Sequence, residues 1–286
     1  MSLPDFSSTD QDDPFEIDTT VAHPARLYNY LLGGSVNFEA DRAFAGALAD
    51  AFPTAKTAAV ENRRFLDRVV TYLVKEAGIR QFLDIGTGIP ATGNVHDVAQ
   101  AIDPGARVAY IDNDPIVLAH ARQLLKSTPS GATAYLHADL RDPEAILAHP
   151  ELHVTLDLTQ PVALLLIAVL HFVEDAHDPH GRVATLSAAL PAGSHLAISH
   201  ASSDLMSPET KTKVTAVSTQ ERDQLRDALH PRDKATVARF FDGMELIEPG
   251  IVPITDWHND IPPNERPPAT DAGIYGAVAR ISQREG

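Results

Sequence analysis

The sequence contains no cysteine, a single tryptophan and far fewer basic than acidic residues. The absence of cysteine excludes disulfides, a thiol nucleophile and a thiolate metal site. With 23 Lys and Arg against 39 Asp and Glu, the formal net charge is -16. Such a surface repels polyphosphates, so we expect no nucleic-acid partner.

The sequence also has no long apolar segment. Its longest apolar run, residues 162–170, is far shorter than the about 20 residues that a membrane-spanning helix needs. The N-terminus shows no basic region followed by an apolar one, as a secretory signal would. We therefore expect a cytoplasmic protein without a membrane partner. No two histidines have a clear metal-binding spacing, so we predict no metal site, and the sequence predicts no oligomeric state.

The composition along the chain predicts a tail and one domain. Residues 1–20 are acidic with few apolar groups, which favours a flexible tail. We expect the remainder, residues 21–286, to form one domain with four consecutive parts: a helical extension or lid (21–78), a cofactor-binding core (79–200), a helical insertion (201–244) and the final strands (245–286).

Apolar periodicity predicts an α/β fold. Stripes at helical spacing occur in residues 24–78 and again in 205–242, while short apolar runs mark strands between and after them. The expected strands are 81–85, 107–111, 133–136, 162–170, 194–198, 246–254 and 273–281. Strands and helices that alternate in this way indicate a doubly wound parallel sheet. The four prolines between the last two strands favour a stiff, extended loop there.

A glycine-rich turn follows the first expected strand. It reads Gly86-Thr87-Gly88, and with Ala91 it matches the pattern G-x-G-x-x-A. At the carboxyl edge of a doubly wound sheet, such a turn lets a ligand approach backbone amides. Asp112 ends the second strand, where an acid accepts hydrogen bonds from ribose hydroxyls. These features alone fit NAD and S-adenosylmethionine equally.

Two further acids favour S-adenosylmethionine. Asp84 precedes the first glycine by two residues, where a carboxylate suits an ammonium or sulfonium better than a pyrophosphate. Asp139 and Leu140 close the third strand, where the acid can accept from the adenine amine while Leu140 packs on the ring. Each of these features also has an interpretation without a ligand: the glycine turn is only a tight turn, Asp112 caps a helix, and Asp139 is a solvated loop residue.

At this point the chain resembles the class I S-adenosylmethionine-dependent methyltransferases over about residues 81–200. It also resembles, along its whole length, a narrow family of methyltransferase-like proteins of unassigned function. The match to that family rests on the segments 26–34, 37–38, 41–42, 61–65 and 169–173. The resemblance implies a Rossmann-like doubly wound sheet of seven strands whose last strand is antiparallel.

The resemblance also implies roles for individual residues. Asp84, Gly86 and Gly88 would surround the methionine part of S-adenosylmethionine. Asp112 would hold the ribose. Asn113 would lie beside the adenine, and Asp139 and Leu140 would frame it. Many methyltransferases have a third glycine where this chain has Pro90, and we expect that proline to fix the start of the next helix.

The segment from Tyr28 to Phe38 has two interpretations. It is either a helix that ends at a diglycine turn and packs on the sheet, or a lid in which Tyr28, Gly34 and Asn37 line the cofactor. Asn62 and Arg63 could reach the same site or lie on an exposed helical face.

Only one side chain suggests itself as a base. His171 follows the fourth strand, where it could take a proton from an acceptor; otherwise it is a strand-end histidine bonded to the backbone. We therefore expect a methyltransferase that acts on a small molecule mainly by aligning it with the methyl group. The alternatives are an NAD-dependent oxidoreductase, although no Tyr-x-x-x-Lys pair is present, and a non-catalytic protein that binds S-adenosylmethionine.

Overall fold

The core of the fold is a mixed sheet. The computed structural model describes residues 18–124, 127–220 and 225–282, so residues 1–17 of the expected acidic tail lie outside the described residues. The strand order is β3-β2-β1-β4-β5-β8-β6, and β7 pairs with β8. The strands are β1 Gln81–Ile85, β2 Arg107–Asp112, β3 Ala132–His137, β4 Ala163–Ile167, β5 His195–Ala201, β6 Glu245–Leu246, β7 Val252–Pro253 and β8 Ile274–Arg280.

Strands β1 to β5 are parallel, and β8 runs antiparallel to β5. This confirms the expected Rossmann-like sheet with an antiparallel last strand. The sheet has eight strands, one more than expected, because the stretch 246–254 forms two short strands. Pro249 has no amide hydrogen to donate to β8, and Gly250 turns the chain with a φ of 80°.

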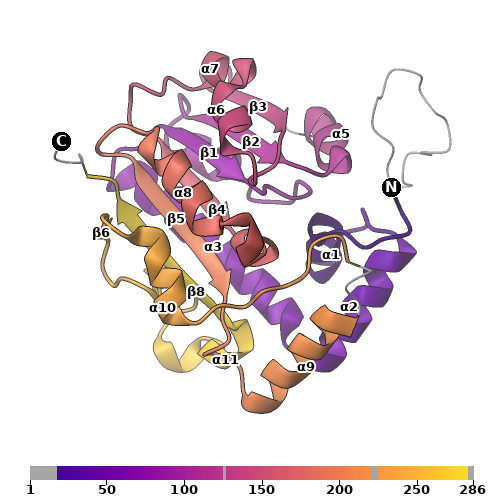
Figure 1. Cartoon of the computed structure of the whole chain (residues 1–286). Coiled ribbons are helices and arrows are strands. Elements are labelled where there is room, and N and C mark those ends of the chain that lie inside the picture. The colour runs from indigo at the N-terminus through magenta and orange to yellow at the C-terminus, as the bar shows by residue number, and fades with distance from the viewer. Residues whose placement is uncertain (1–17, 125–126, 221–224, 283–286) are drawn as a thin grey trace.

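Helices cover both faces of this sheet (Figure 1). Alternate residues of β1 and β4 belong to two separate apolar clusters, one on each face. One face is covered by α3 Ala55–Lys75 and α4 Val95–Ile102, and the other by α6 Pro143–Ala148, α7 Pro150–Thr155, α8 Pro179–Ala188 and α10 Lys234–Ala238. Burial on both faces explains why β4 is an unbroken aliphatic run.

The extension is helical, as the apolar stripes in residues 24–78 predict, and it contains three helices. They are α1 Pro24–Leu31, α2 Glu39–Ala51 and α3. Helix α1 begins at Pro24, which needs no amide partner at the first helical position, and the chain leaves it through Gly33 with a φ of 81°. Helices α1 and α2 share a small apolar cluster with Val217 of α9, Pro208–Gln220, and all three helices lie beyond the main sheet (Figure 1).

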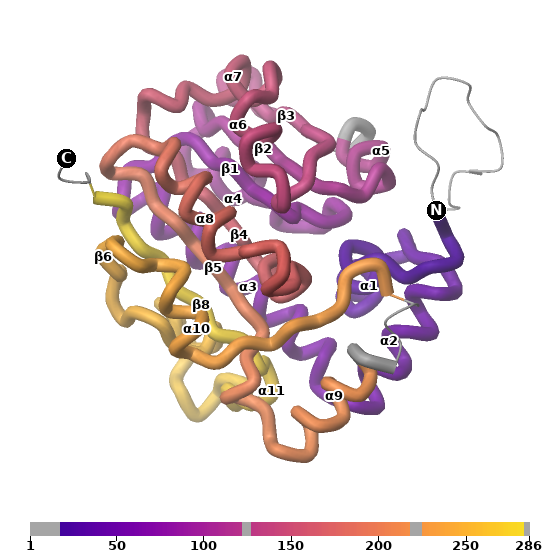
Figure 2. Tube along the Cα trace, viewed as in Figure 1, coloured from indigo at the N-terminus to yellow at the C-terminus, as the bar shows by residue number. Residues whose placement is uncertain are grey.

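The insertion is less helical than the periodicity of 205–242 predicts. Between α9 and α10 the described residues 225–233 are extended: Leu225 forms a parallel bridge with Ala22, and Arg232 forms one with Ser202. In Figure 2 this segment runs from the neighbourhood of α1 to α10. The loop 255–272 is also not simply extended, since it contains η4 Pro263–Glu265 and α11 Ala269–Ala272. Tertiary pairing therefore overrides local periodicity in residues 225–233.

Candidate functional site

A cavity of about 970 Å³ lies at the carboxyl edge of the parallel strands. Loops that follow β1, β2, β3 and β4 line it, together with α1, α3 and the segment before α10. Because parallel strands end at the same edge, their terminal side chains meet there. The wall includes nearly all of the residues predicted for the cofactor: Tyr28, Asp84, Gly86, Thr87, Gly88, Asp112, Asn113, Asp139 and Leu140. Gly34 is the exception; it lies beside Asn29 in the loop after α1 and does not line the cavity.

The glycine turn serves close packing more than amide donation. A Cβ on Gly86 would collide with the side chain of Val169, and the φ of Gly86 is 76°. The amides of Gly86 and Thr87 donate to the Ile111 carbonyl, and that of Gly88 donates to the Asp112 carboxylate at 2.8 Å. The expectation that these amides are available to a ligand is therefore wrong: the turn uses them to join the end of β2.

The following helix begins later than expected. Helix α4 starts at Val95 with Asn94 as its cap, so Pro90 lies in the loop and does not fix the helix start. A pyrophosphate in a dinucleotide site is held by a helix N-terminus and by free amides of the glycine turn. Among the described residues, α4 does not line the cavity and the amides of the turn are already bonded, which argues against the NAD-dependent alternative.

Asp84 places a buried carboxylate in the cavity wall. Only 7% of the residue is exposed, and in the described part of the chain no hydrogen bond reaches its carboxylate. Burial raises the pKa of Asp84 to about 7, while the nearby Arg63 guanidinium opposes the rise and Asp112 adds to it. A carboxylate that is removed from water without a partner favours a cationic ligand.

Asp112 is the second buried acid of this edge. Burial raises its pKa to about 6, although the amides of Gly88 and Asp114 donate to its two oxygens. It is not the cap of α5, Pro115–Leu124, because the Asp114 carboxylate accepts from the Ile116 amide. Each carboxylate oxygen has a second lone pair, so Asp112 can still accept from a ligand hydroxyl.

Asp139 is already engaged within the protein. Burial opposes its ionisation, but hydrogen bonds from Arg141 and Asn113 outweigh that effect and lower the pKa of Asp139 to about 2. Arg141 also donates to Asp227 at 2.9 Å, which brings the insertion to the same side of the cavity. The role of Asp139 toward adenine stays a prediction.

Tyr28 anchors the extension to the sheet. Its hydroxyl donates to the Ala59 carbonyl at 3.0 Å and accepts from the Asn62 amide at 2.9 Å. The Ser199 hydroxyl donates to the Asn62 carbonyl oxygen at 2.6 Å and accepts from the amide of Ala168. This chain of hydrogen bonds joins α1 and α3 to the ends of β4 and β5, so the extension packs on the sheet and also lines the cavity.

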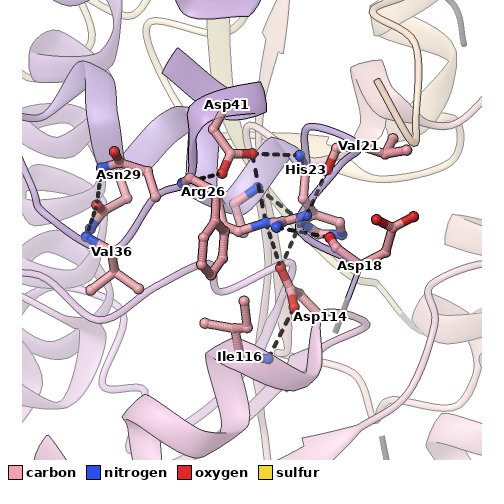
Figure 3. A network of polar contacts seen from close by, with 12 residues as sticks. Asp18, Val21, His23, Arg26, Asn29, Val36, Asp41, Asp114 and Ile116 are labelled. Carbon is pink, nitrogen blue, oxygen red and sulfur yellow. Dashed lines mark hydrogen bonds and ion pairs between the residues drawn. The ribbon is translucent and has the colours of Figure 1, made fainter. Parts of the chain in front are cut away.

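A buried ionic cluster holds the extension against α5 (Figure 3). We call His23, Arg26, Asp41 and Asp114 the hinge cluster. The Arg26 Nε atom lies 3.7 Å from Asp41 and 3.5 Å from Asp114, and His23 Nδ1 lies 3.2 Å from Asp114. The backbone amide of His23 also donates to Asp41 at 2.9 Å. Each member is less than a tenth exposed. Burial lowers the pKa of His23, and its Nδ1 atom accepts from the Ala25 amide, so the ionic contacts are those of Arg26 with the two carboxylates. Removing one partner of such a buried pair is costly.

His171 lies outside this cavity. It belongs to η1 Leu170–Phe172, and its Nδ1 atom accepts from the Ala201 amide at 3.2 Å. This is the backbone-bonded arrangement weighed above as the alternative to a base. Burial holds the pKa of His171 well below its usual value, and the neighbouring His200 and Arg232 add to the effect. With Nδ1 as an acceptor, the ring proton is on Nε2, which makes His171 a donor.

A second cavity of about 840 Å³ adjoins the first. We call it the apolar cavity. It shares four wall residues with the first cavity: Pro24, Tyr28, Ala168 and Phe172. His171 lines it, and Ala168 stands at the shared wall with a φ of 56°. A non-glycine residue in this conformation is strained, as often occurs at functional sites.

Sequence reasoning missed several wall residues. His23, Arg141 and Asp227 line the first cavity, and Arg63 does so as one of the two interpretations allowed. His23 and Asp227 come from the extension and the insertion, far from the motif in sequence. Only the fold brings them to the strand ends, and no spacing pattern signals that.

Comparisons with known proteins agree with this geometry. The model of a family described as S-adenosyl methyltransferase matches residues 10–282. A solved structure of a DUF574 family protein from Streptomyces avermitilis is 45% identical, covers 93% of this chain and 99% of that one, and has a TM-score of 0.87. A Thermobifida fusca protein named as a candidate methyltransferase is 36% identical over 93% of this chain and 97% of that one, with a TM-score of 0.83. No curated protein matches.

Proposed function

This chain belongs to the S-adenosyl methyltransferase family, and we propose that it binds S-adenosylmethionine in the first cavity and transfers its methyl group to a small molecule. The observation that carries the proposal is the Asp84 carboxylate, buried in the wall of that cavity with no hydrogen bond from the described residues. Arg63 is near but makes no hydrogen bond to this carboxylate, so a ligand with an ammonium group and a sulfonium can supply a direct cationic partner.

In this proposal, different residues of the first cavity bind different parts of S-adenosylmethionine. Asp84 accepts from the ammonium of the methionine part, and the Arg63 guanidinium beside it suits the methionine carboxylate. Asp112 accepts from the ribose hydroxyls, with the Gly88 amide holding its carboxylate in place. Asn113, Asp139 and Leu140 surround the adenine in this proposal.

The chemistry needs little from the protein beyond alignment. When bound, S-adenosylmethionine supplies a methyl group on a positively charged sulfur, which is a good leaving group. The chain's own part is to exclude water and to hold the acceptor in line, which is where most of such an acceleration arises. The two cavities meet at a shared wall formed by Pro24, Tyr28, Ala168 and Phe172.

A small-molecule acceptor fits this arrangement better than a nucleic acid. The formal charge of -16 repels polyphosphate, and the extension and insertion close over the strand ends through the Ala22–Leu225 bridge. In the described part of the chain, no helix is long and apolar enough to cross a membrane.

Calorimetry on the full chain tests the proposal. We expect S-adenosylmethionine and S-adenosylhomocysteine to bind, and NADH not to bind. Binding of NADH in preference to both would overturn the assignment in favour of the oxidoreductase. Conversion of labelled S-adenosylmethionine in the presence of a metabolite extract then separates an enzyme from a non-catalytic binding protein.

A further inference from the structure

The wall of the apolar cavity is almost entirely nonpolar. It lies between α1, α2, α3, α9 and the start of β8. Most of its wall is aliphatic or aromatic, as shown by Leu27, Leu31, Phe44, Leu48, Phe52, Val214, Val217, Leu225, Leu229 and Ile274. Such a lining is typical of sites that take small apolar molecules.

The described residues of this wall include no charged side chain that could pair with a charged ligand. No Asp, Glu, Lys or Arg is among the described residues that form it; its only ionisable side chains are Tyr28 and His171. Burying an ammonium or a carboxylate here would remove its hydration without a compensating partner. Neutral, mainly apolar molecules lose little water on entry and gain contact with the wall.

His171 contributes one polar group to this wall. Because Ala201 donates to Nδ1, Nε2 keeps the ring proton and can donate a hydrogen bond, but it cannot accept a proton. Tyr28 has its hydroxyl committed to Ala59 and Asn62. The cavity therefore offers a donor but no base.

We propose that the apolar cavity binds the methyl acceptor, and that this acceptor is an uncharged, mainly apolar molecule with a phenolic hydroxyl. The inference rests on the proposed function for its methyl donor. It is carried by the shared wall at Tyr28, Ala168 and Phe172, by the absence of charge in the lining and by the donor character of His171.

Because the cavity offers no base, the acceptor must be a group that loses its proton without one. A phenol loses its proton near pH 10, much more readily than an aliphatic alcohol, and the His171 N–H can stabilise the phenolate oxygen. An aliphatic amine is protonated at neutral pH and would enter as a cation. In the step itself the oxygen–methyl bond forms, the sulfur–methyl bond breaks with its electron pair left on sulfur, and the phenolic proton goes to solvent.

The test compares three probes on the full chain saturated with S-adenosylhomocysteine: 2-naphthol, naphthalene and 6-hydroxy-2-naphthoate. We expect 2-naphthol to bind, naphthalene to bind about three- to tenfold less tightly for lack of the hydrogen bond, and the naphthoate at least tenfold less tightly than 2-naphthol. Equal or tighter binding of the charged probe, or no binding of 2-naphthol up to its solubility, would overturn the proposal.

Two variants of α9 locate the probe. Val217 lines the cavity, so Val217→Trp fills it and should weaken 2-naphthol binding at least tenfold. Lys211 is exposed on the same helix, so Lys211→Trp adds the same ring outside the cavity and should change nothing. Both variants should bind S-adenosylhomocysteine like the parent, which checks that they are folded. Equal binding of 2-naphthol by both variants would place it elsewhere.

A pair of substitutions tests His171 separately. His171→Asn keeps an acceptor near the Ala201 amide and loses the Nε2 donor, whereas His171→Gln keeps a donor near the position of Nε2. We expect the asparagine variant to lose the preference for 2-naphthol over naphthalene, and the glutamine variant to keep part of it. If 2-naphthol binds in the cavity while S-adenosylhomocysteine never binds, the proposed function fails and the ligand site remains.

Discussion

The raised pKa of Asp84 predicts that the affinity for S-adenosylmethionine depends on pH. In the free protein burial raises this pKa to about 7, with Arg63 opposing the shift from α3 and Asp112 adding to it from β2. Only the ionised carboxylate can pair with an ammonium group. The sign follows directly: affinity rises as the pH rises through the pKa, and binding at lower pH releases a proton.

The size of the effect comes from the ionised fraction of Asp84. With a pKa of about 7, that fraction is about 3% at pH 5.5 and about 75% at pH 7.5, a ratio of about 25-fold. Asp112, whose pKa is about 6, adds about fourfold over the same interval. At the upper limit of pH 7.5 about 60–75% of the ligand's own α-amino group is still protonated, since such groups titrate at about 7.7–8.0.

Calorimetric titrations from pH 5.5 to 7.5 measure this dependence on the full chain. The Asp84→Asn variant should bind less tightly at pH 7.5 and keep only the smaller slope from Asp112. Asp50→Asn, which removes an exposed carboxylate of α2, is the matched control and should follow the parent. An Asp84→Asn variant whose affinity still changes about 25-fold would refute the role given to Asp84.

Three further predictions concern stability and the glycine turn. Because the pKa of Asp84 is raised, its ionisation destabilises the ligand-free fold. Asp84→Asn should therefore increase the free energy of unfolding by up to about 4 kcal/mol above pH 7. Urea titrations should show this gain shrink as the pH falls toward 4. In Gly86→Ala the new methyl group would collide with Val169, so the unfolding temperature should fall and calorimetry should detect no cofactor binding. Gly88 has open space around it, so Gly88→Ala should lower the free energy of unfolding only by the about 1–2 kcal/mol that a positive φ costs a non-glycine residue. Arg26→Met should lower the free energy of unfolding by about 3–5 kcal/mol, because two buried carboxylates lose their partner, while Arg42→Met at an exposed position should change it little.

The cofactor edge could be predicted because its geometry follows from local rules. The strands are short apolar runs bounded by turn residues, and β1 occupies the expected residues 81–85. Once the strands are known to be parallel, Asp84, Asp112 and Asp139 must come together, since they end neighbouring strands of one edge. This inference needs no knowledge of side-chain packing.

The rest depends on contacts between distant segments, which spacing does not encode. Leu225 fits a helical stripe, but in the fold it pairs with Ala22 as a strand residue. Pro90 resembles a helix start, yet α4 begins at Val95. The functional meaning of His171 likewise depends on a single amide hydrogen bond from Ala201, and no sequence pattern shows which ring nitrogen that bond occupies.

The hinge cluster has a consequence for how sequences of this family diverge. His23, Arg26, Asp41 and Asp114 lie on three separate segments, and all are buried. Losing Arg26 leaves two buried carboxylates without the cation they share, so this single substitution is disfavoured. We expect these four positions to covary among relatives, with the ionic set exchanged for an apolar set together. The junction between the N-terminal extension and the cofactor edge would then be inherited as a unit.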